Sequence, residues 1–452
     1  MSGTTEPTRP AAVGFGEAFR FWLKLGFISF GGPAGQIAIM HAELVERRRW
    51  ISEKRFLHAL NYCMLLPGPE AQQLATYIGW LMHRTWGGIV AGGLFVLPSL
   101  FLLIFLSWIY VAYGNAPLVA GLFYGIKPAV TVIVLHAAWR IGGRVLKNSW
   151  LWAIAGAAFV AIFALQVPFP LIVLAAGVAG YVGGRIAPGR FKAGGAHGTS
   201  NASFGPAVID DDTPTPIHAR FSRARLTGVV AAGLALWALP MALLVAWGGL
   251  HGTYTQMGWF FTKAALLTFG GAYAVLPYVY QGAVITHGWL TPTQMIDGLA
   301  LGETTPGPLI MVVAFVGFVG GWQSSELAAL LGAEHRFLAG AIAACLVTWF
   351  TFLPSFVFIL AGGPLVESTH DDLKFTAPLT AISAAVVGVI VNLALFFALH
   401  VLWPQGLGGA FDVAGAAIAV AAAVALFRFG AGVIPVIVAS GVAGLALRLA
   451  LP

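Results

Sequence analysis

Residues 29–52 read SFGGPAGQIAIMHAELVERRRWIS, and residues 268–291 read TFGGAYAVLPYVYQGAVITHGWLT. The two stretches share an FGG triplet and, twenty residues after its phenylalanine, a tryptophan followed by an isoleucine or leucine and then a serine or threonine. Each stretch precedes a PGP triplet, at residues 67–69 and 306–308, and all of these matches are separated by 239 residues. Three motifs that match at one common separation are not expected by chance, so we infer an internal duplication.

The repeat extends beyond these motifs into both halves of the chain. A lysine matches at the same separation, and further matches downstream are separated by 256 residues. The second half therefore carries an insertion of 17 residues, which we place in the polar stretch between residues 322 and 337. The matching residues are Lys24 with Lys263, Pro98 and Ser99 with Pro354 and Ser355, and Ile126 with Ile382.

The composition places this duplicated chain in a membrane. Of its 452 residues, 59% are hydrophobic and 9% are charged, and the mean hydropathy is +0.85. Globular domains carry about 25% charged residues, so these numbers exclude a soluble, disordered or coiled-coil protein, and two cysteines exclude a disulfide-stapled one. The net charge of +7 fits Lys and Arg collected in cytoplasmic loops, rather than nucleic-acid binding. We predict an all-α polytopic membrane protein.

The apolar blocks predict about thirteen membrane-embedded segments. We divide the chain into a polar tail (1–14), a first repeat (15–186), a polar cytoplasmic linker (187–226), a connecting transmembrane helix (227–250) and a second repeat (251–452). The blocks in the two repeats are roughly 15–42, 55–83, 86–113, 117–140, 150–166 and 168–186, then 256–283, 293–320, 338–362, 377–402, 409–427 and 431–450.

If the six segments of a repeat return the chain to its starting side, the connecting helix is expected to make the second repeat inverted relative to the first. Inverted repeats with a site between them are typical of secondary transporters. The basic residues of the first half share one side only if blocks 15–42 and 55–83 each enter and leave on the same side. Each of these blocks is interrupted in its middle, at residues 31–33 and 67–69. We therefore expect broken, re-entrant helices at the FGG and PGP motifs.

The interruptions are also where an anion is expected to bind. Glycine and proline leave backbone N–H and C=O groups unpaired, and lipid tolerates such groups only against protein or a polar cavity. The half-helices that follow Pro33 and Pro69 present free N–H groups, and helix N-termini attract anions. Four breaks paired by the duplication are expected to converge on one polar centre. The alternative is that these residues only kink the helices.

Charged and polar residues near the breaks are the candidate site. Lys24 and Lys263 suit an anionic substrate, although each could instead extend to the membrane surface. Glu70 and Glu303 are candidate proton carriers, and the alternative is that they cap helix starts. Side chains that can donate hydrogen bonds to an oxyanion, or hold helices together, are Gln36, Gln72, Gln73, Thr304 and Thr305.

No motif indicates an enzyme, a metal site or a cofactor. The sequence has no Walker A motif, GxSxG elbow, HExxH pair or dinucleotide fingerprint. An ATP-driven pump is therefore disfavoured, and a membrane enzyme acting on an anionic lipid lacks a nucleophile or redox centre.

The motifs resemble those of the chromate ion transporter (CHR) family, in its long two-domain form. The resemblance rests on residues 29–52, on LLPGPEAQQLATYIGWL at 65–81, on GGLFVLPS at 92–99 and on TFGGAYAVLPYV and GETTPGPLIM at 268–279 and 302–311. It covers the whole chain apart from the linker and the tail. The second FGG precedes Ala272 rather than a proline, so the two breaks need not be equivalent. The family motif positions are Phe30, Gly31, Gly32, Pro33, Trp50, Pro67, Gly68, Pro69, Glu70, Phe269, Gly270, Gly271, Glu303, Pro306, Gly307 and Pro308.

The resemblance implies a multi-pass protein of the inner (plasma) membrane that exports chromate, driven by the proton gradient. Sulfate is a structural analogue of chromate, and composition cannot separate the two. The expected partners are a chromate- or sulfate-like oxyanion, protons and the lipid bilayer, with a homodimer as a further assembly to consider. The alternatives are an oxyanion channel or a sulfate-type carrier not dedicated to chromate.

Overall fold

The computed structural model describes residues 10–30, 32–114, 116–191, 204–269, 271–367 and 376–450. Over these residues the chain is helical, and an isolated β-bridge joins Ile51 to Ile209. Among the described residues, seven helices are long and apolar enough to cross a membrane. The predicted class, an all-α polytopic membrane protein, is therefore confirmed. Gly31 and Gly270, one from each FGG triplet, lie outside the described residues.

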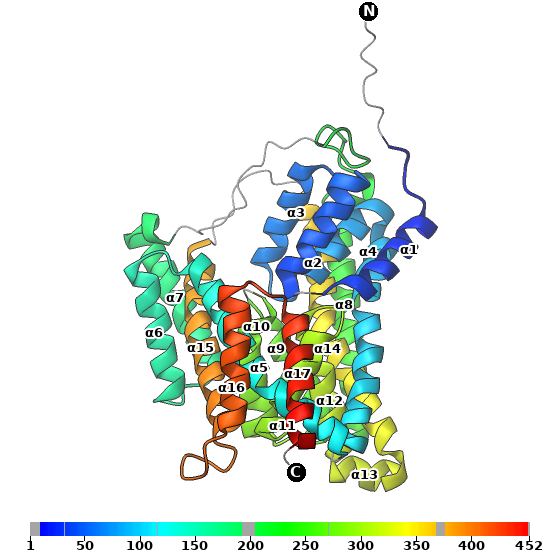
Figure 1. Ribbon diagram of the computed structural model, residues 1–452. Helices are drawn as coiled ribbons and strands as arrows, with labels where there is room; N and C mark the ends of the chain where they lie inside the picture. The colour runs from blue at the N-terminus through cyan, green and yellow to red at the C-terminus, as the bar shows by residue number, and fades with distance from the viewer. Residues whose placement is uncertain are drawn as a thin grey trace, which may run out of the picture.

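Within the described residues, the first half forms seven α-helices and the second half forms nine, with α8 (Arg223–Gly248) between them (Figure 1). The first half contains α1 (Phe15–Ile28), α2 (Gly32–His41), η1 (Ala42–Arg47), α3 (Glu53–Leu65), α4 (Glu70–Tyr113), α5 (Pro117–Val145), α6 (Ser149–Phe163) and α7 (Phe169–Ile186). The second half contains α9 (Thr253–Leu266), α10 (Ala272–Tyr280), η4 (Gln281–Thr286), α11 (Pro292–Thr304), η5 (Leu309–Met311), α12 (Val312–Gln323), α13 (Ser325–Leu331), η6 (Ala333–His335), α14 (Arg336–Val366), α15 (Thr376–Leu402), α16 (Val413–Ala423), η7 (Val424–Arg428) and α17 (Val433–Ala450).

The element bounds repeat at the separation seen in the sequence. The π-helical turns η1 and η4 are 239 residues apart at both ends, and so are α3 and α11. In both halves the helical structure is interrupted twice. The first interruption lies before α2 in the first half and before α10 in the second, and the other lies at the PGP triplet. The local structure therefore follows the duplicated sequence.

The long helix α4 runs through the gap predicted at residues 84–85. It has 44 residues and is bent at His83 and Arg84, whose backbone is not helical. The equivalent position of the second half is the end of α12, where the inserted residues form α13 before α14 begins. At equivalent positions, the first half thus has a bend within one helix and the second half has an inserted helix.

Of the roughly thirteen membrane-embedded segments predicted, helix length and hydropathy support seven or eight as spans among the described residues. Seven helices pass the length and hydropathy test, and the pair Leu309–Gln323 and Ser325–Leu331, bent by 67°, makes eight. The other predicted segments correspond to shorter helices, because the breaks divide them. Two of these, Ser149–Phe163 and Val413–Arg428, are apolar but short.

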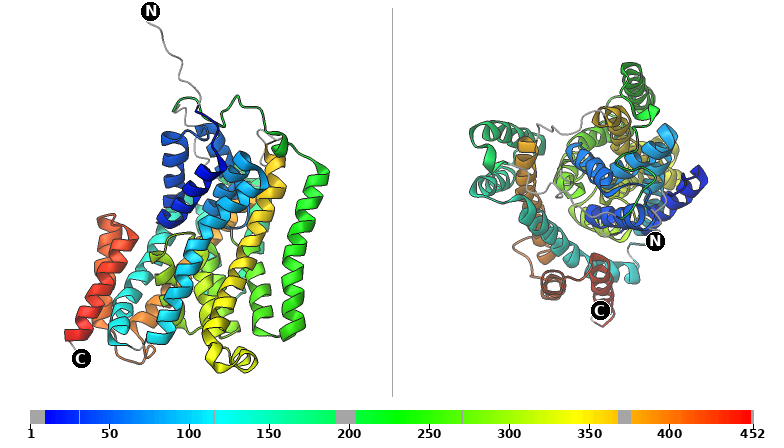
Figure 2. Two further views of the ribbon diagram at one scale, coloured as in Figure 1. Left: turned by 90° about the vertical axis from the view of Figure 1, so that its right-hand side faces the viewer. Right: turned by 90° about the horizontal axis from the view of Figure 1, so that it is seen from above.

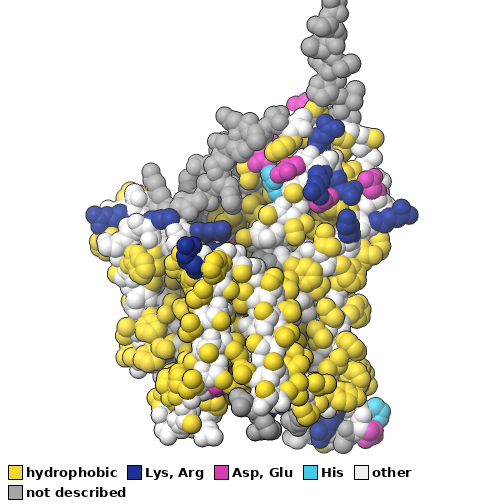
Figure 3. Space-filling model, in the orientation of Figure 1, with side chains coloured by type: hydrophobic (Ala, Val, Ile, Leu, Met, Phe, Trp, Pro, Cys, Tyr) yellow, Lys and Arg dark blue, Asp and Glu magenta, His cyan; other side chains and the backbone are white. Residues whose placement is uncertain are grey.

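The two halves interlock rather than stand side by side. Helix α15 packs against α5, α6 and α7, α17 packs against α5, and α14 packs against α4. Seen from above, α6 and α7 stand at the edge of the molecule, with α15 beside them (Figure 2). Hydrophobic side chains cover the sides of the bundle, and most of the Lys and Arg side chains visible on the face in Figure 3 lie above this belt.

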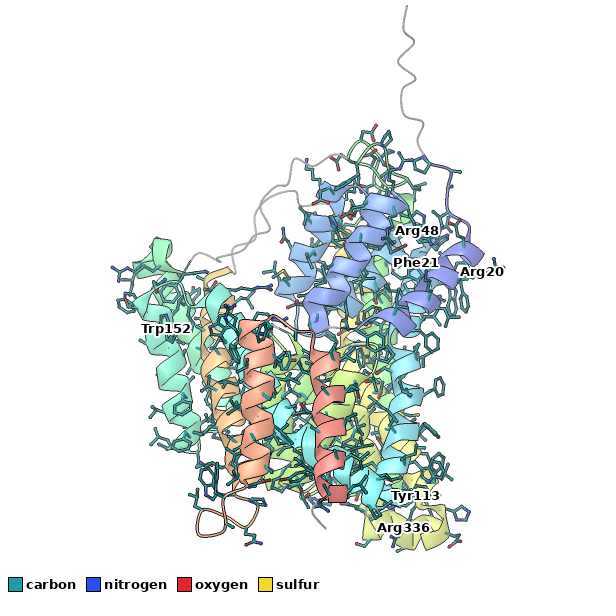
Figure 4. The ribbon with its side chains drawn as sticks, in the orientation of Figure 1. Arg20, Phe21, Arg48, Tyr113, Trp152 and Arg336 are labelled. Carbon is teal, nitrogen blue, oxygen red and sulfur yellow. The ribbon has the colours of Figure 1, made fainter. Side chains whose placement is uncertain are left out.

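The described part of the linker packs onto the upper end of the first half (Figure 1). Ile209 accepts a hydrogen bond from the Ser52 amide at 2.9 Å and donates one to the Trp50 carbonyl at 3.0 Å. Farther along, His218 Nε2 lies 2.9 Å from the Trp80 carbonyl oxygen. Arg48, labelled near this end in Figure 4, covers the Phe21 ring at 5.0 Å. The linker thus joins the loop before α3 to the bend in α4.

Candidate functional site

The glycines of both PGP triplets adopt backbone angles that L-residues rarely adopt. Gly68 has φ of +129° and Gly307 has φ of +102°. A Cβ added at Gly307 would lie 2.8 Å from the Ser99 Cβ, and one at Gly68 would lie 2.6 Å from Gln73 Nε2 and closer still to Ser355 Oγ. Both conformation and space therefore require glycine at these positions.

The two PGP breaks exchange hydrogen bonds with the two FGG breaks. The Gly68 amide donates to the Thr268 carbonyl at 2.7 Å, and the Gly307 amide donates to the Ser29 carbonyl at 2.8 Å. Ser29 and Thr268 are equivalent in the repeat, as are Gly68 and Gly307. The PGP break of each half is therefore hydrogen-bonded to the FGG break of the other half.

A pair of repeat-equivalent serines completes this exchange. Ser355 in α14 lies against Gly68, and Ser99 in α4 lies against Gly307. Ser355 Oγ accepts a hydrogen bond from Gln73 Nε2 at 3.4 Å, whereas Ser99 Oγ is buried and has no partner among the described residues. We did not single out these serines as site residues from the sequence, although their match at 256 residues was the available signal.

The glutamines of the first half bind the broken backbone. Gln36 Nε2 donates to the Gly307 carbonyl at 2.5 Å and to the Ser29 carbonyl at 3.3 Å. Gln73 Nε2 donates to the Pro67 carbonyl at 2.8 Å, and Gln72 Nε2 donates to the Thr76 hydroxyl at 3.0 Å. These amide donors are engaged within the protein, but the Oε1 atoms of the latter two glutamines are buried without a partner in the described part of the chain.

The polar character of this centre is asymmetric. The repeat equivalents of Gln36, Gln72 and Gln73 are apolar in the second half, as are those of Glu70 and its neighbours. The hydroxyls of Thr304 and Thr305 donate back to carbonyls of α11. Buried polar atoms without partners need an explanation, such as a bound ion or water, and those of this centre come from α4.

Two carboxylates flank the centre, and two arginines of α5 act on them electrostatically. Glu303 accepts a short hydrogen bond from the Tyr273 hydroxyl, while Glu70 is the first residue of α4. Arg140 interacts electrostatically with Glu303, and Arg144 interacts electrostatically with Glu70. The arginines are four residues apart and thus lie on one face of the helix.

Lys24 and Lys263 are not brought to the breaks. Both side chains lie on exposed faces of their helices, α1 and α9. The Lys263 ammonium lies 5.9 Å from the centre of the Trp259 ring. The described residues provide no hydrogen bond or ion pair between either lysine and the centre.

A second cluster of charged residues lies away from the breaks. Asp297 of α11 accepts a hydrogen bond from the Tyr110 hydroxyl at 2.8 Å and pairs with Lys127 at 3.4 Å. We did not single out this cluster from the sequence. Its signal was available, because Asp297 and Lys127 are ionisable residues inside apolar blocks.

The fold and the site together define a multi-pass membrane protein built from two related halves around reciprocally bonded breaks, a construction typical of secondary transporters. The model of the family described as "Chromate transporter" matches residues 16–181 and again residues 255–445. The chain therefore belongs to the chromate transporter family, which is a family of transport proteins and not of enzymes. The resemblance noted in the sequence is thus confirmed.

Named relatives agree with this assignment. The "Chromate transport protein" of Pseudomonas aeruginosa is 34% identical over 86% of this chain and 82% of that protein. The protein of the same name from Cupriavidus metallidurans is 28% identical over 84% and 81%. The "Uncharacterized transporter YwrA" of Bacillus subtilis is 29% identical over 30% of this chain and 77% of its own length, so it is closer in size to one half. No solved structure matches the chain.

Proposed function

We propose that this chain is a secondary active transporter that exports chromate, or a related tetrahedral oxyanion such as sulfate, across the inner membrane in exchange for protons. The single observation that carries the proposal is the reciprocal bonding of the two PGP breaks to the two FGG breaks. It provides one centre made by both halves, as alternating access around a fixed site requires. Chromate as the substrate is supported by the names of the relatives.

The proposed architecture is two inverted repeats of six embedded segments joined by α8, thirteen segments in all. Figure 1 supports the inversion, because α3 lies at the upper end of the molecule and its equivalent α11 lies at the lower end. The linker supports re-entrant entry for residues 55–83. It contacts both Trp50 and Trp80, so the loop before α3 and the bend in α4 lie at one end.

This arrangement predicts the topology of two arginines. Cysteines introduced at Arg48 and at Arg84 in a cysteine-free background are expected to react with a membrane-impermeant maleimide from the same side, the cytoplasm. The reason is that Trp50 and Ser52 are hydrogen-bonded to Ile209 of the linker, and Trp80, one turn before the bend at residues 83–84, is hydrogen-bonded to His218 of the same linker. Labelling of the two cysteines from opposite sides would contradict the re-entrant arrangement.

In the proposed mechanism the oxyanion approaches the broken helices beside Glu70 and Glu303. Arg140 and Arg144 attract the anion, and the two carboxylates compete with it for these arginines. Such competition couples proton movement to anion movement, because the arginines stay in place and only their negatively charged partner changes.

The test of this function is transport by everted membrane vesicles. With radioactive chromate as the probe, an acid-inside pH gradient is expected to drive accumulation above equilibrium, and the rate is expected to saturate with chromate concentration. Unlabelled sulfate competes if the site accepts any tetrahedral dianion. Flux that only equilibrates chromate and does not saturate would instead identify a channel.

The basic pair predicts a change in apparent affinity. Arg140→Gln is expected to raise the KM for chromate about tenfold, equivalent to about 1.4 kcal/mol, because a partly screened charge pair contributes energy of this order. The matched control is Arg185→Gln, since the Arg185 guanidinium covers the Tyr181 ring at 4.3 Å on α7. An unchanged KM in the Arg140 variant would remove the arginine from the site.

A further inference from the structure

The cluster of Asp297, Lys127 and Tyr110 has an unused acceptor. Asp297 is 2% exposed, and both of its partners bond the same atom, Oδ2. The other oxygen, Oδ1, is buried and has no hydrogen-bond partner among the described residues. A carboxylate oxygen in this state binds a proton more readily than one that already holds two donors.

The charges around Asp297 are few. Helix α11 packs against α4, α5, α12, α15, α17 and η5. Of the ionisable side chains on these elements, Lys127 and Tyr110 act on Asp297. Other ionisable side chains on these elements have partners elsewhere: Glu303 is bonded to Tyr273, Tyr124 to Asp412 and His400 to the Phe396 carbonyl, and Arg448 lies over the Tyr124 ring.

The cluster joins the two halves at the end opposite to the linker. Asp297 belongs to the second half, and both partners belong to the first. Tyr110 is one turn from Tyr113, which Figure 4 labels at the lower end of α4. The Lys127 side chain is 28% exposed, so it connects the buried carboxylate to the outside of the bundle. Helix α11 ends at the PGP break, two turns after Asp297.

We propose that Asp297 is a second proton-binding site of the transporter, separate from the oxyanion centre. This inference rests on the proposed function. One proton from water binds Oδ1 and makes the carboxyl neutral, while Lys127 keeps its own charge and loses its ion partner. The bond that holds α11 to α5 is then weakened, which frees the helix that leads to Gly307. Release of the same proton restores the pair.

A cluster at the opposite end provides the comparison. Glu367, at the end of α14, pairs with Arg55 at 3.3 Å through Oε2 and accepts a hydrogen bond from Tyr77 at 2.5 Å through Oε1. It also joins the two halves and is also nearly buried. Both of its oxygens hold donors, however, so it offers no equivalent place for a proton. Glu367→Gln is thus a matched control.

The experiment uses the full chain in proteoliposomes with radioactive chromate, in two assays. Uphill uptake driven by a pH gradient of two units measures coupling, and exchange of internal for external chromate at equal pH measures binding and alternation without net proton movement. The variants are Asp297→Asn, the double variant Asp297→Asn with Lys127→Gln, and Glu367→Gln. The double variant guards against misfolding, because it leaves no unpaired lysine.

We expect the double variant to lose uphill accumulation, with an inside-to-outside ratio near one, and to keep exchange within about twofold of wild type at an unchanged KM. Glu367→Gln is expected to keep uphill accumulation. Uphill accumulation that is retained in the double variant overturns the proposal. Loss of chromate exchange in a double variant of normal abundance also overturns it, because Asp297 and Lys127 would then be needed for the structure and not for proton coupling. Failure of the proposed function itself is distinguishable, because wild type then shows no uphill chromate uptake.

Discussion

Gly307→Ala and Gly68→Ala are each expected to lower chromate transport at least tenfold and to reduce the amount of folded protein in the membrane. A non-glycine residue at such positive φ costs about 1–3 kcal/mol. The added methyl group meets Ser99 at Gly307 and meets Ser355 and Gln73 at Gly68, and overpacking of this kind costs about 1–3 kcal/mol more. The displaced loop also loses the hydrogen bond to the other half.

The measurement is radioactive chromate uptake by vesicles, normalised to the quantity of protein found by immunoblot. Gly93→Ala is the matched control, because Gly93 lies within α4 and a Cβ there meets nothing within 4 Å. Alanine in a helix interior is favoured over glycine by about 0.5–1 kcal/mol, so this variant is expected to transport normally. Wild-type rates in both Gly68→Ala and Gly307→Ala would mean that the paired breaks are not the transport centre.

The interruptions of the helices were predictable because their signals are local. Glycine and proline act on the backbone at their own positions, so the PGP triplets already indicated where α3 and α11 end. The repeat separation of 239 residues also predicted which elements are equivalent. Helix α7 begins and ends within about one residue of the predicted block, because polar residues and a proline bound it.

The division of α4 was harder to predict because a bend and a loop have similar sequences. Residues 82–86 contain a histidine, an arginine and a threonine, which indicated a gap between two blocks. In the structure Arg84 takes φ of +58° and the chain continues directly as helix. The contact of the linker with Trp80 and the packing of α14 hold this bend, and neither is encoded near it.

The partners of each charged residue could not be predicted, because they come from distant parts of the chain. Tyr110 and Asp297 are 187 residues apart, and Gln36 and Gly307 are 271 residues apart. Sequence reasoning identified the lysines that match in the repeat, and the structure leaves both exposed. It overlooked Arg140 and Arg144, because a basic pair near a helix end also indicates membrane topology.

Glu303→Gln is expected to abolish chromate resistance without lowering the abundance of the protein. The amide keeps an oxygen that can accept the Tyr273 hydrogen bond, so the local structure is retained. The side chain no longer takes up or releases a proton, and it no longer competes with the anion for Arg140. We therefore expect tighter apparent chromate binding together with a transport rate at least a hundredfold lower, and a rate independent of the pH gradient.

Three comparisons make this outcome specific to the carboxylate. Tyr273→Phe removes the hydrogen bond but keeps the proton site, so it is expected to retain transport that depends on the pH gradient, at a rate lowered by about tenfold or less. Glu326→Gln changes a glutamate that binds Thr253 at 2.6 Å and is expected to behave as wild type. Asp297→Asn is expected to leave the KM unchanged, whereas Glu303→Gln lowers it, because Glu303 shares an arginine with the substrate and Asp297 does not. Normal resistance in Glu303→Gln would show that coupling does not pass through the break of the second half.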